Sequence, residues 1–133
     1  MPRTDNIYHL IDDAQNDGQP KYRLGAVIAL GDSGDPRAVR TLIECCYDDN
    51  PDIRMYAIEA LGKLRSGRSG PALIARLNDR TEQPGLRKSA AAALAAIGSF
   101  GAIEALNERA LDTREEQEIR SCCTDLLVKM GIR

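Results

Sequence analysis

Apolar residues recur every three or four positions along most of this chain, the spacing that places side chains on one face of an α-helix. Two such stripes stand out between residues 35 and 64. The first contains Val39, Leu42, Ile43 and Cys46, and the second contains Ile53, Ala57, Ala60, Leu61 and Leu64. A polar turn at residues 48–50 separates them, and Pro51 suits the first turn of a helix. The pattern predicts two adjacent helices joined by a short turn.

The pair of stripes occurs four times, so the chain is an internal repeat. Each second stripe begins with an arginine that is followed by a small or apolar residue three, six and seven positions later. These arginines are Arg23, Arg54, Arg87 and Arg120. An aspartate closes the helix before each of them, at Asp17, Asp48, Asp79 and Asp112. It precedes the arginine by six residues in the first two copies and by eight in the last two, which predicts a two-residue insertion in the later turns.

Residues 29–43 followed by residues 48–62 resemble HEAT repeats of the phycobilin-lyase-like class. The most specific elements are the spacing of Asp48 and Arg54 and the Ala-Leu-Gly segments at 29–31 and 60–62. The resemblance covers nearly the whole chain. It implies an all-α fold, an α-α superhelix (solenoid) of four HEAT-like helix pairs, with the second helices lining a concave surface and the Asp and Arg residues forming a structural ladder between repeats. We expect one domain over residues 1–133, with units at about 5–34, 35–67, 68–98 and 99–133.

The two outer units differ from the central ones at one position of the first helix. Ile43 and Ile74 occupy this position in the central units, whereas Asp12 and Asn107 occupy it in the outer units. A terminal repeat turns toward water the face that an inner repeat packs on its neighbour. The substitutions therefore predict capped ends without open-ended stacking, and a monomer or weak homodimer.

Composition and charge narrow the class of partner. The 133 residues include 18 Lys and Arg against 20 Asp and Glu, a formal net charge of −2. A nonspecific nucleic-acid binder needs an excess of positive charge, so nucleic acid is a disfavoured partner. The chain has no run of 18 apolar residues, and residues 1–6 lack the apolar core of a signal peptide. We expect a cytoplasmic protein that does not bind membranes.

The residues that carry catalytic chemistry are scarce. His9 is the single histidine, and one histidine does not make the paired ligands of a metal site. The resemblance associates the metal-dependent hydroxylase branch of HEAT-like proteins with repeated His-Glu pairs, and the sequence contains none. The four cysteines form two adjacent pairs, 45–46 and 122–123, without the C-x-x-C spacing of a zinc site. We expect no enzymatic activity, no metal and no cofactor.

A second stripe on each second helix, separate from its core stripe, is expected to face the concave surface. Flexible methionine and amphipathic tyrosine suit protein interfaces, so this stripe predicts a partner-binding groove. Its expected residues are Leu24, Ile28, Met55, Tyr56, Glu59 and Lys63, and its counterparts in the third unit are Lys88, Ser89, Ala92 and Ala96.

These observations favour a noncatalytic protein-protein interaction module, a small scaffold or adaptor whose concave surface binds a protein or peptide. An alternative implied only by the resemblance is a chromophore-lyase-like or assembly-chaperone subunit. Cys122 lies in the groove stripe and is the residue whose thiol chemistry would serve that alternative.

Overall fold

The computed structural model describes residues 6–132, which form helices joined by short turns. The α-helices are α1 (Ile7–Asn16), α2 (Pro20–Ser33), α3 (Val39–Cys45), α4 (Pro51–Leu64), α5 (Gly70–Asn78), α6 (Pro84–Ile97), α7 (Phe100–Leu111) and α8 (Gln117–Lys129). Two short 3₁₀ helices, η2 (Pro36–Ala38) and η3 (Gly67–Ser69), lead into α3 and α5. The expected units begin at residue 5 and end at residue 133, and both of these residues lie outside the described range.

Local sequence sets where the second helix of a pair begins and ends. Proline stands in the first turn of α2, α4 and α6, where its missing N–H is not needed. The Asn50 side chain caps α4 by accepting a hydrogen bond from the backbone N–H of Asp52 at 2.8 Å. Gly34 and Gly98 end α2 and α6 in the left-handed conformation, with φ of 68° and 67°, which glycine adopts at little cost.

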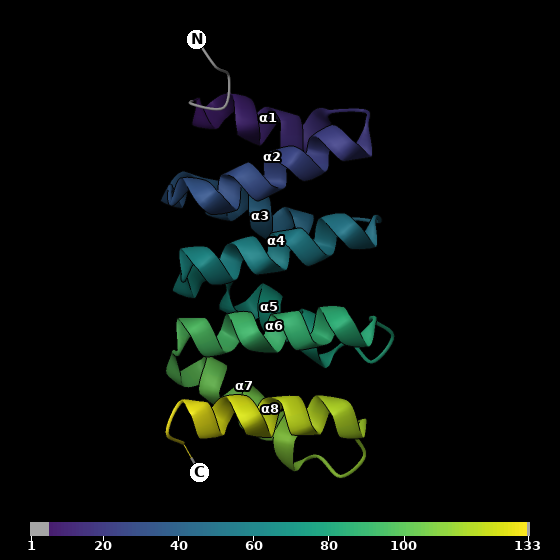
Figure 1. Cartoon of the computed structure of the whole chain (residues 1–133), viewed down its shortest axis with the longest axis vertical. Coiled ribbons are helices and arrows are strands. Elements are labelled where there is room, and N and C mark those ends of the chain that lie inside the picture. The colour runs from purple at the N-terminus through teal and green to yellow at the C-terminus, as the bar shows by residue number, and fades with distance from the viewer. Residues whose placement is uncertain (1–5, 133) are drawn as a thin grey trace.

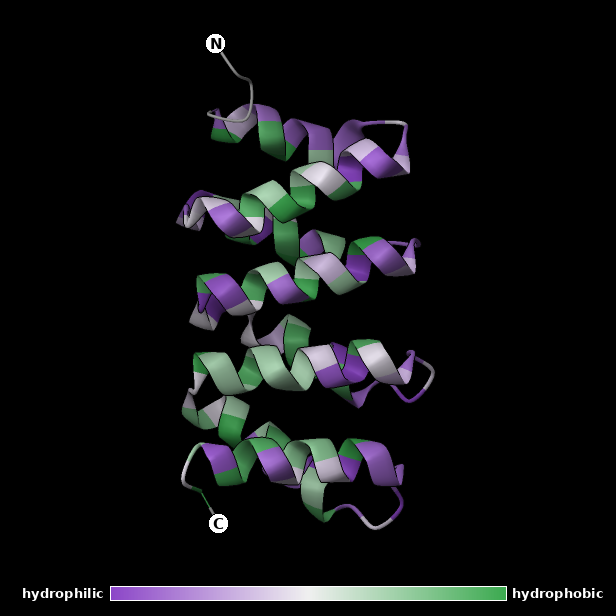
Figure 2. Ribbon diagram, in the orientation of Figure 1, coloured by the Kyte–Doolittle hydropathy of each residue, from purple (hydrophilic) through white to green (hydrophobic). Residues whose placement is uncertain are grey.

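The helices stack as antiparallel pairs along one long axis (Figure 1). In this view α2, α4, α6 and α8 form the near layer, whereas α3, α5 and α7 lie behind it. The turns inside the helix pairs all lie on the right of the view, and Figure 2 shows that they are mostly hydrophilic. The arrangement confirms the predicted all-α solenoid.

The core lies between the two layers and is built from the predicted stripes. Ile53, Leu61, Leu86, Leu94 and Ile119 have almost no exposed surface, and burying a side chain of this size contributes about 1.5–3 kcal/mol. The cysteines at positions 45, 46 and 123 are buried among them. Packing of the apolar stripes therefore accounts for most of the stability of the stack.

Small residues let neighbouring second helices approach closely. A Cβ atom added to Gly31 of α2 would lie 2.6 Å from the Cβ of Ala60 in α4, which is too close for any side chain. At Gly62, the equivalent position of α4, an added Cβ would lie 3.2 Å from the Cβ of Ala93 in α6. The Ala-Leu-Gly segments thus mark the points where the helix backbones come together.

The predicted ladder between repeats exists, but two of its acidic residues differ from the prediction. Asp48 pairs with Arg23 as expected. Arg54 instead pairs with Glu82 through two contacts of 2.9 Å, and Arg87 pairs with Glu115 at 2.5 and 3.0 Å. The insertion in the later turns places a glutamate where the aspartate was expected.

Asp79 and Asp112 order the later turns. Asp79 accepts a hydrogen bond from the backbone N–H of Thr81, and Asp112 accepts one from the backbone N–H of Arg114, both at 2.9 Å.

Within residues 6–132, no helix is both long and apolar enough to cross a membrane.

Candidate functional site

The six residues of the predicted groove lie on two neighbouring helices, α2 and α4. Ile28, Tyr56, Glu59 and Lys63 are exposed, whereas Leu24 and Met55 are half-buried. The sequence pattern therefore placed four of the six on an accessible face.

A cavity of about 410 Å³ lies one helix further along, between α4 and α6. Glu59 and Lys63 line it together with Gly62 of α4 and with four residues of α6, of which Ser89, Ala92 and Ala96 were predicted on the corresponding stripe of the third unit. The lining residues are Glu59, Gly62, Lys63, Ser89, Ala92, Ala93 and Ala96. Leu24, Ile28, Met55 and Tyr56 are not among them, so the structure divides the predicted groove into two parts.

Met55 is turned toward α6 and does not form a free contact in the groove. Its sulfur accepts a hydrogen bond from the Ser89 hydroxyl at 3.1 Å, and its side chain packs against the core. The flexible thioether fills the space between the two helices, as methionine often does. Met55 is half-buried in this position, and its role as a partner contact stays a prediction.

The two charged side chains at the cavity, Glu59 and Lys63, differ in their surroundings. Lys63 donates a hydrogen bond from Nζ to Asp32 Oδ1 of α2 at 2.9 Å, and this contact raises the pKa of the Lys63 ammonium. Glu59 is an exposed carboxylate at the rim of the cavity. Glu59 also acts on Lys63 in the same direction, so the two carboxylates and the one ammonium together carry one net negative charge.

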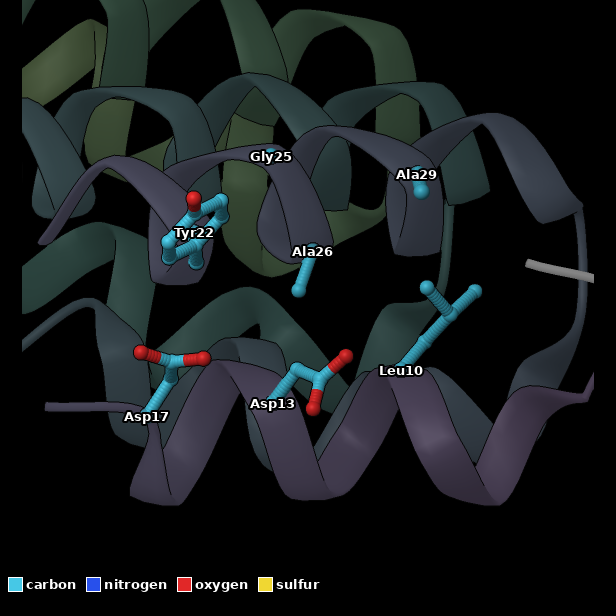
Figure 3. Close-up of a pocket in the computed structure, with 7 residues that line it drawn as sticks. All are labelled: Leu10, Asp13, Asp17, Tyr22, Gly25, Ala26 and Ala29. Carbon is cyan, nitrogen blue, oxygen red and sulfur yellow. The ribbon is translucent and has the colours of Figure 1, made fainter. Parts of the chain in front are cut away.

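A second cleft, of about 490 Å³, lies between α1 and α2, where the sequence pattern predicted no site. Figure 3 shows Asp13 and Asp17 on one side of it, with Tyr22 and Ala26 of α2 on the other. Leu10, Gly25 and Ala29 complete the lining. The one signal that marked this place in the sequence is Asp17, the first aspartate of the repeat.

The cysteines are poor nucleophiles in this fold. Burial raises the pKa of Cys45 to about 11 and those of Cys46 and Cys123 to about 12. Burial also raises the pKa of Cys122, although Lys88 acts in the opposite direction. Because the thiolate is the reactive form, the thiols are largely unreactive near neutral pH.

The part of the chain that the structure describes does not fit a metal centre of the His-Glu kind. No three His, Cys, Asp or Glu side chains within residues 6–132 come together in a group that could hold an ion. His9, the one histidine, lies on an exposed face of α1. We therefore assign no step of metal chemistry to these residues.

Comparison with known proteins gives a consistent fold. A family model described as HEAT repeats matches residues 7–84. The structure of human deoxyhypusine hydroxylase in complex with glycerol is 28% identical with a TM-score of 0.83, over 95% of this chain and 43% of that one. The complex of CpcE and CpcF of phycocyanin lyase from Nostoc sp. PCC7120 is 22% identical with a TM-score of 0.71, over 93% of this chain and 52% of that one. These matches confirm the resemblance drawn from the repeat.

Two curated relatives carry the same enzyme name. Deoxyhypusine hydroxylase of Arabidopsis thaliana is 33% identical over 101 residues, which are 76% of this chain and 32% of the relative. Deoxyhypusine hydroxylase of Bos taurus is 30% identical over 96 residues, which are 71% of this chain and 32% of the relative. The matched part of the chain therefore spans about a third of the length of these relatives.

The relatives overturn two expectations drawn from the sequence. The noncatalytic scaffold or adaptor and the absence of enzymatic activity are both wrong, because the relatives and the structural neighbour at 28% identity are named as an enzyme. The lyase-like alternative is not matched either, because likeness to the lyase at 22% identity concerns the fold alone. The error arose because a repeat fold and the absence of a recognised catalytic motif do not by themselves establish function.

Proposed function

We propose, from the premise that this chain belongs to the HEAT-repeat family, that it forms a substrate-binding part of an enzyme related to deoxyhypusine hydroxylase. The observation that carries the proposal is the cavity between α4 and α6, which combines a surface of small apolar side chains with the exposed carboxylate of Glu59. The likeness in sequence and fold to deoxyhypusine hydroxylases supports the class of enzyme.

The lining of the cavity suits an aliphatic chain that ends in an amine. Gly62, Ala92 and Ala96 expose small apolar surfaces. The methylene groups of a ligand can pack on these surfaces without burying an unpaired polar group. Glu59 at the rim supplies an anionic acceptor for an ammonium group, and such charge-assisted hydrogen bonds are the stronger kind. Deoxyhypusine, a lysine derivative with an aliphatic amine extension, has this chemistry.

Lys63 does not oppose the binding of a cation at this cavity. Lys63 lines the cavity, but its ammonium forms an ion pair with Asp32 of α2 at 2.9 Å, and this carboxylate offsets its positive charge. Both side chains are exposed, so this ion pair contributes little to stability. In the proposal, the Asp32 carboxylate of this pair offsets the positive charge of Lys63 beside Glu59. We assign substrate binding, and no step of the reaction, to these residues.

The proposal is tested by titrating the protein with a fluorescent peptide that contains one deoxyhypusine residue. We expect binding to the wild type and an affinity about tenfold lower for Glu59→Gln, which keeps the shape and removes the charge. Ala96→Leu narrows the cavity with a larger side chain and is expected to weaken binding. Glu108→Gln, which changes an exposed glutamate of α7 away from the cavity, serves as the matched control.

Two results contradict the proposal. One is a wild type that does not bind the peptide at millimolar concentration. The other is a Glu59→Gln variant that binds as tightly as the wild type and the Glu108→Gln control. A peptide with unmodified lysine at the same position measures how much of the affinity comes from charge alone.

The cytoplasmic location is part of the same proposal. All four cysteines are free thiols, three of them buried, which is typical of proteins in reducing compartments. A protein substrate would meet the chain there. Fractionation of cells that produce the protein with a small epitope tag tests this location, and recovery with secreted proteins contradicts it.

A further inference from the structure

Three arginines of the ladder, Arg23, Arg54 and Arg87, make the same two kinds of contact. Each guanidinium donates a hydrogen bond to a backbone carbonyl near the end of the first helix of its own pair. Arg23 donates to Ala14 O at 3.1 Å, and Arg87 donates to Leu77 O at 2.8 Å. The same guanidinium then reaches a carboxylate in the turn of the next helix pair. A complete rung therefore needs residues from two consecutive pairs.

Arg120 has the first of these contacts and lacks the second. It donates from Nε to Ala110 O at 3.5 Å, which matches the other arginines. Within residues 6–132, no carboxylate forms an ion pair with its guanidinium. It lines a cavity of about 240 Å³, and Asp125 lines the same cavity without forming an ion pair with it. Arg120 is therefore half of a rung.

Asp17 is the other half at the opposite end of the stack. It lies 31 residues before Asp48, the same spacing that separates Arg23 from Arg54. Its Oδ1 accepts a hydrogen bond from the backbone N–H of Gln19 at 2.8 Å, just as Asp48 accepts one from Asn50 at 2.8 Å. No arginine or lysine in the described part of the chain forms an ion pair with Asp17.

Beside these two residues, positions that are buried in the inner pairs are exposed. Thr124 and Val128 are exposed on the face of α8 that carries Arg120, with Val128 63% exposed. The equivalents of Thr124 in the inner helices are completely buried against the next pair, and they are Val27, Ile58 and Ala91. The outer face of α8 therefore presents the surface that elsewhere covers a following helix.

The cleft between α1 and α2 presents the receiving surface. Tyr22 and Ala29 line it, and they stand at the positions that Ile53 and Ala60 occupy in α4. Ile53 and Ala60 are buried, and Ala60 is the residue on which Gly31 of α2 rests. Tyr22, by contrast, is 53% exposed. The cleft is thus lined by residues whose equivalents in α4 are buried, with Ala60 packed against the preceding helix α2.

We propose that a second copy of this chain docks head to tail on the first, with α8 of one copy over the α1–α2 cleft of the other and Arg120 paired with Asp17. The contact would repeat between copies the rung that Arg23 and Asp48 form within one copy. It goes beyond the proposed substrate binding, because the cavity between α4 and α6 lies elsewhere.

The polar residues on the first helices of the outer pairs limit this contact. Asp12 and Asn107 are exposed there, and they predicted capped ends. The docking surface proposed here is formed by the second helices and the turn, where the ladder positions remain unfilled. A head-to-tail contact can continue from copy to copy, so the proposal departs from the expectation of ends that do not stack. Because Asp12 and Asn107 leave polar surface beside each contact, we expect weak association that depends on concentration.

The test is sedimentation velocity of the whole chain over a range of concentrations, with charge reversals at both ends. Asp17→Arg and Arg120→Asp, each alone, place like charges in the contact and are expected to weaken association about tenfold or more. An equal mixture of the two restores an opposite pair at every contact and is expected to associate as the wild type does. The double variant is expected to associate with itself.

A milder variant separates the loss of the charge from a loss of the fold, and a control variant tests whether any reversal of charge alters association. Asp17→Asn retains the acceptor for Gln19 N–H and removes the charge, so it should weaken association while its circular dichroism stays that of the wild type. Arg68→Glu reverses an exposed charge in η3, away from both ends and from the proposed substrate cavity, and should not change association. A monomeric wild type at the highest attainable concentration overturns the proposal, and so does a mixture of the single variants that does not associate.

Discussion

The first and last rungs of the ladder use the same arginine position but bury it to different extents. The side chains of Arg23 and Asp48 are 20% and 17% exposed, whereas those of Arg87 and Glu115 are 0% exposed. The last rung also contains Arg109, whose Nη1 lies 3.0 Å from Glu115 Oε1. One motif therefore produces a partly hydrated pair at one end of the stack and a buried cluster of charges at the other.

One residue of the first helix accounts for the additional charge. Arg76 and Arg109 occupy equivalent positions in the third and fourth pairs, where they contact Glu82 and Glu115. In the second pair this position is Cys45. The Nε atoms of Arg76 and Arg109 are buried without a hydrogen-bond partner in the described part of the chain. The second arginine thus strengthens each later rung at a desolvation cost.

The close approach of neighbouring second helices follows the opposite order, because the helices come closest near the first rung. In the contact of α2 with α4, a Cβ added to Gly31 would lie 2.6 Å from the Cβ of Ala60. In the contact of α4 with α6, a Cβ added to Gly62 would lie 3.2 Å from the Cβ of Ala93. In α6 the equivalent residue is Ala95, so a side chain is tolerated. The contact with the more exposed ion pair is the one in which the helices approach most closely.

Removal of the buried arginine gives the largest expected effect. Arg87→Ala leaves Glu115 buried with Arg109 as its remaining partner, and we expect the free energy of unfolding to fall by about 3–5 kcal/mol. Urea denaturation followed by circular dichroism measures the change. Arg23→Ala is the matched control, because its more exposed pair is expected to contribute about 1 kcal/mol or less. Equal losses for the two variants would show that burial does not distinguish the rungs.

Acid should weaken the last rung through Glu115. Burial alone would raise the pKa of this carboxyl, but the hydrogen bonds from Arg87, from the backbone N–H of Glu116 and from Arg109 lower it from 4.5 to about 2. A lowered pKa stabilises the fold above the unfolded value of 4.5. This contribution is lost as the pH falls from about 4.5 to about 2.

The measurement is urea denaturation of the wild type and of Glu115→Gln between pH 7 and pH 2. The wild type should lose stability across this interval, and Glu115→Gln should be less stable at pH 7 with a shallower dependence on acid. Asp48→Asn provides the comparison from the first rung. The same steep acid dependence in Glu115→Gln and the wild type would contradict the assignment.

The glycine contacts give a smaller effect with the opposite regional order. Gly31→Ala places a methyl group against Ala60 and should destabilise the protein by about 1–3 kcal/mol, because overpacking shifts the two helices apart. Gly62→Ala meets Ala93 at a longer distance and should cost less. Thermal unfolding of the two variants ranks them. A larger loss for Gly62→Ala would reverse the order of close approach inferred for these contacts.

The repeat of arginine and small residues determined the helices and their stacking. Apolar spacing is a local property of a helix, so Ile53 and Leu61 could be assigned to the core without knowledge of their neighbours. The sequence did not determine which acid completes each rung. Asp79 and Glu82 lie three residues apart in one turn, and the backbone path of that turn decides which carboxylate faces Arg54.

The candidate site was predicted only in part for a related reason. Glu59 and Lys63 could be placed on an exposed stripe of α4, but the cavity they line also needs Ala92 and Ala96 of α6. The turn of Met55 toward Ser89 depends on how α4 and α6 rotate against each other. The sequence by itself determined the helices, their core faces and the family. Only the tertiary structure decided the rungs and cavities, because these form between segments about 30 residues apart whose relative placement no local pattern specifies.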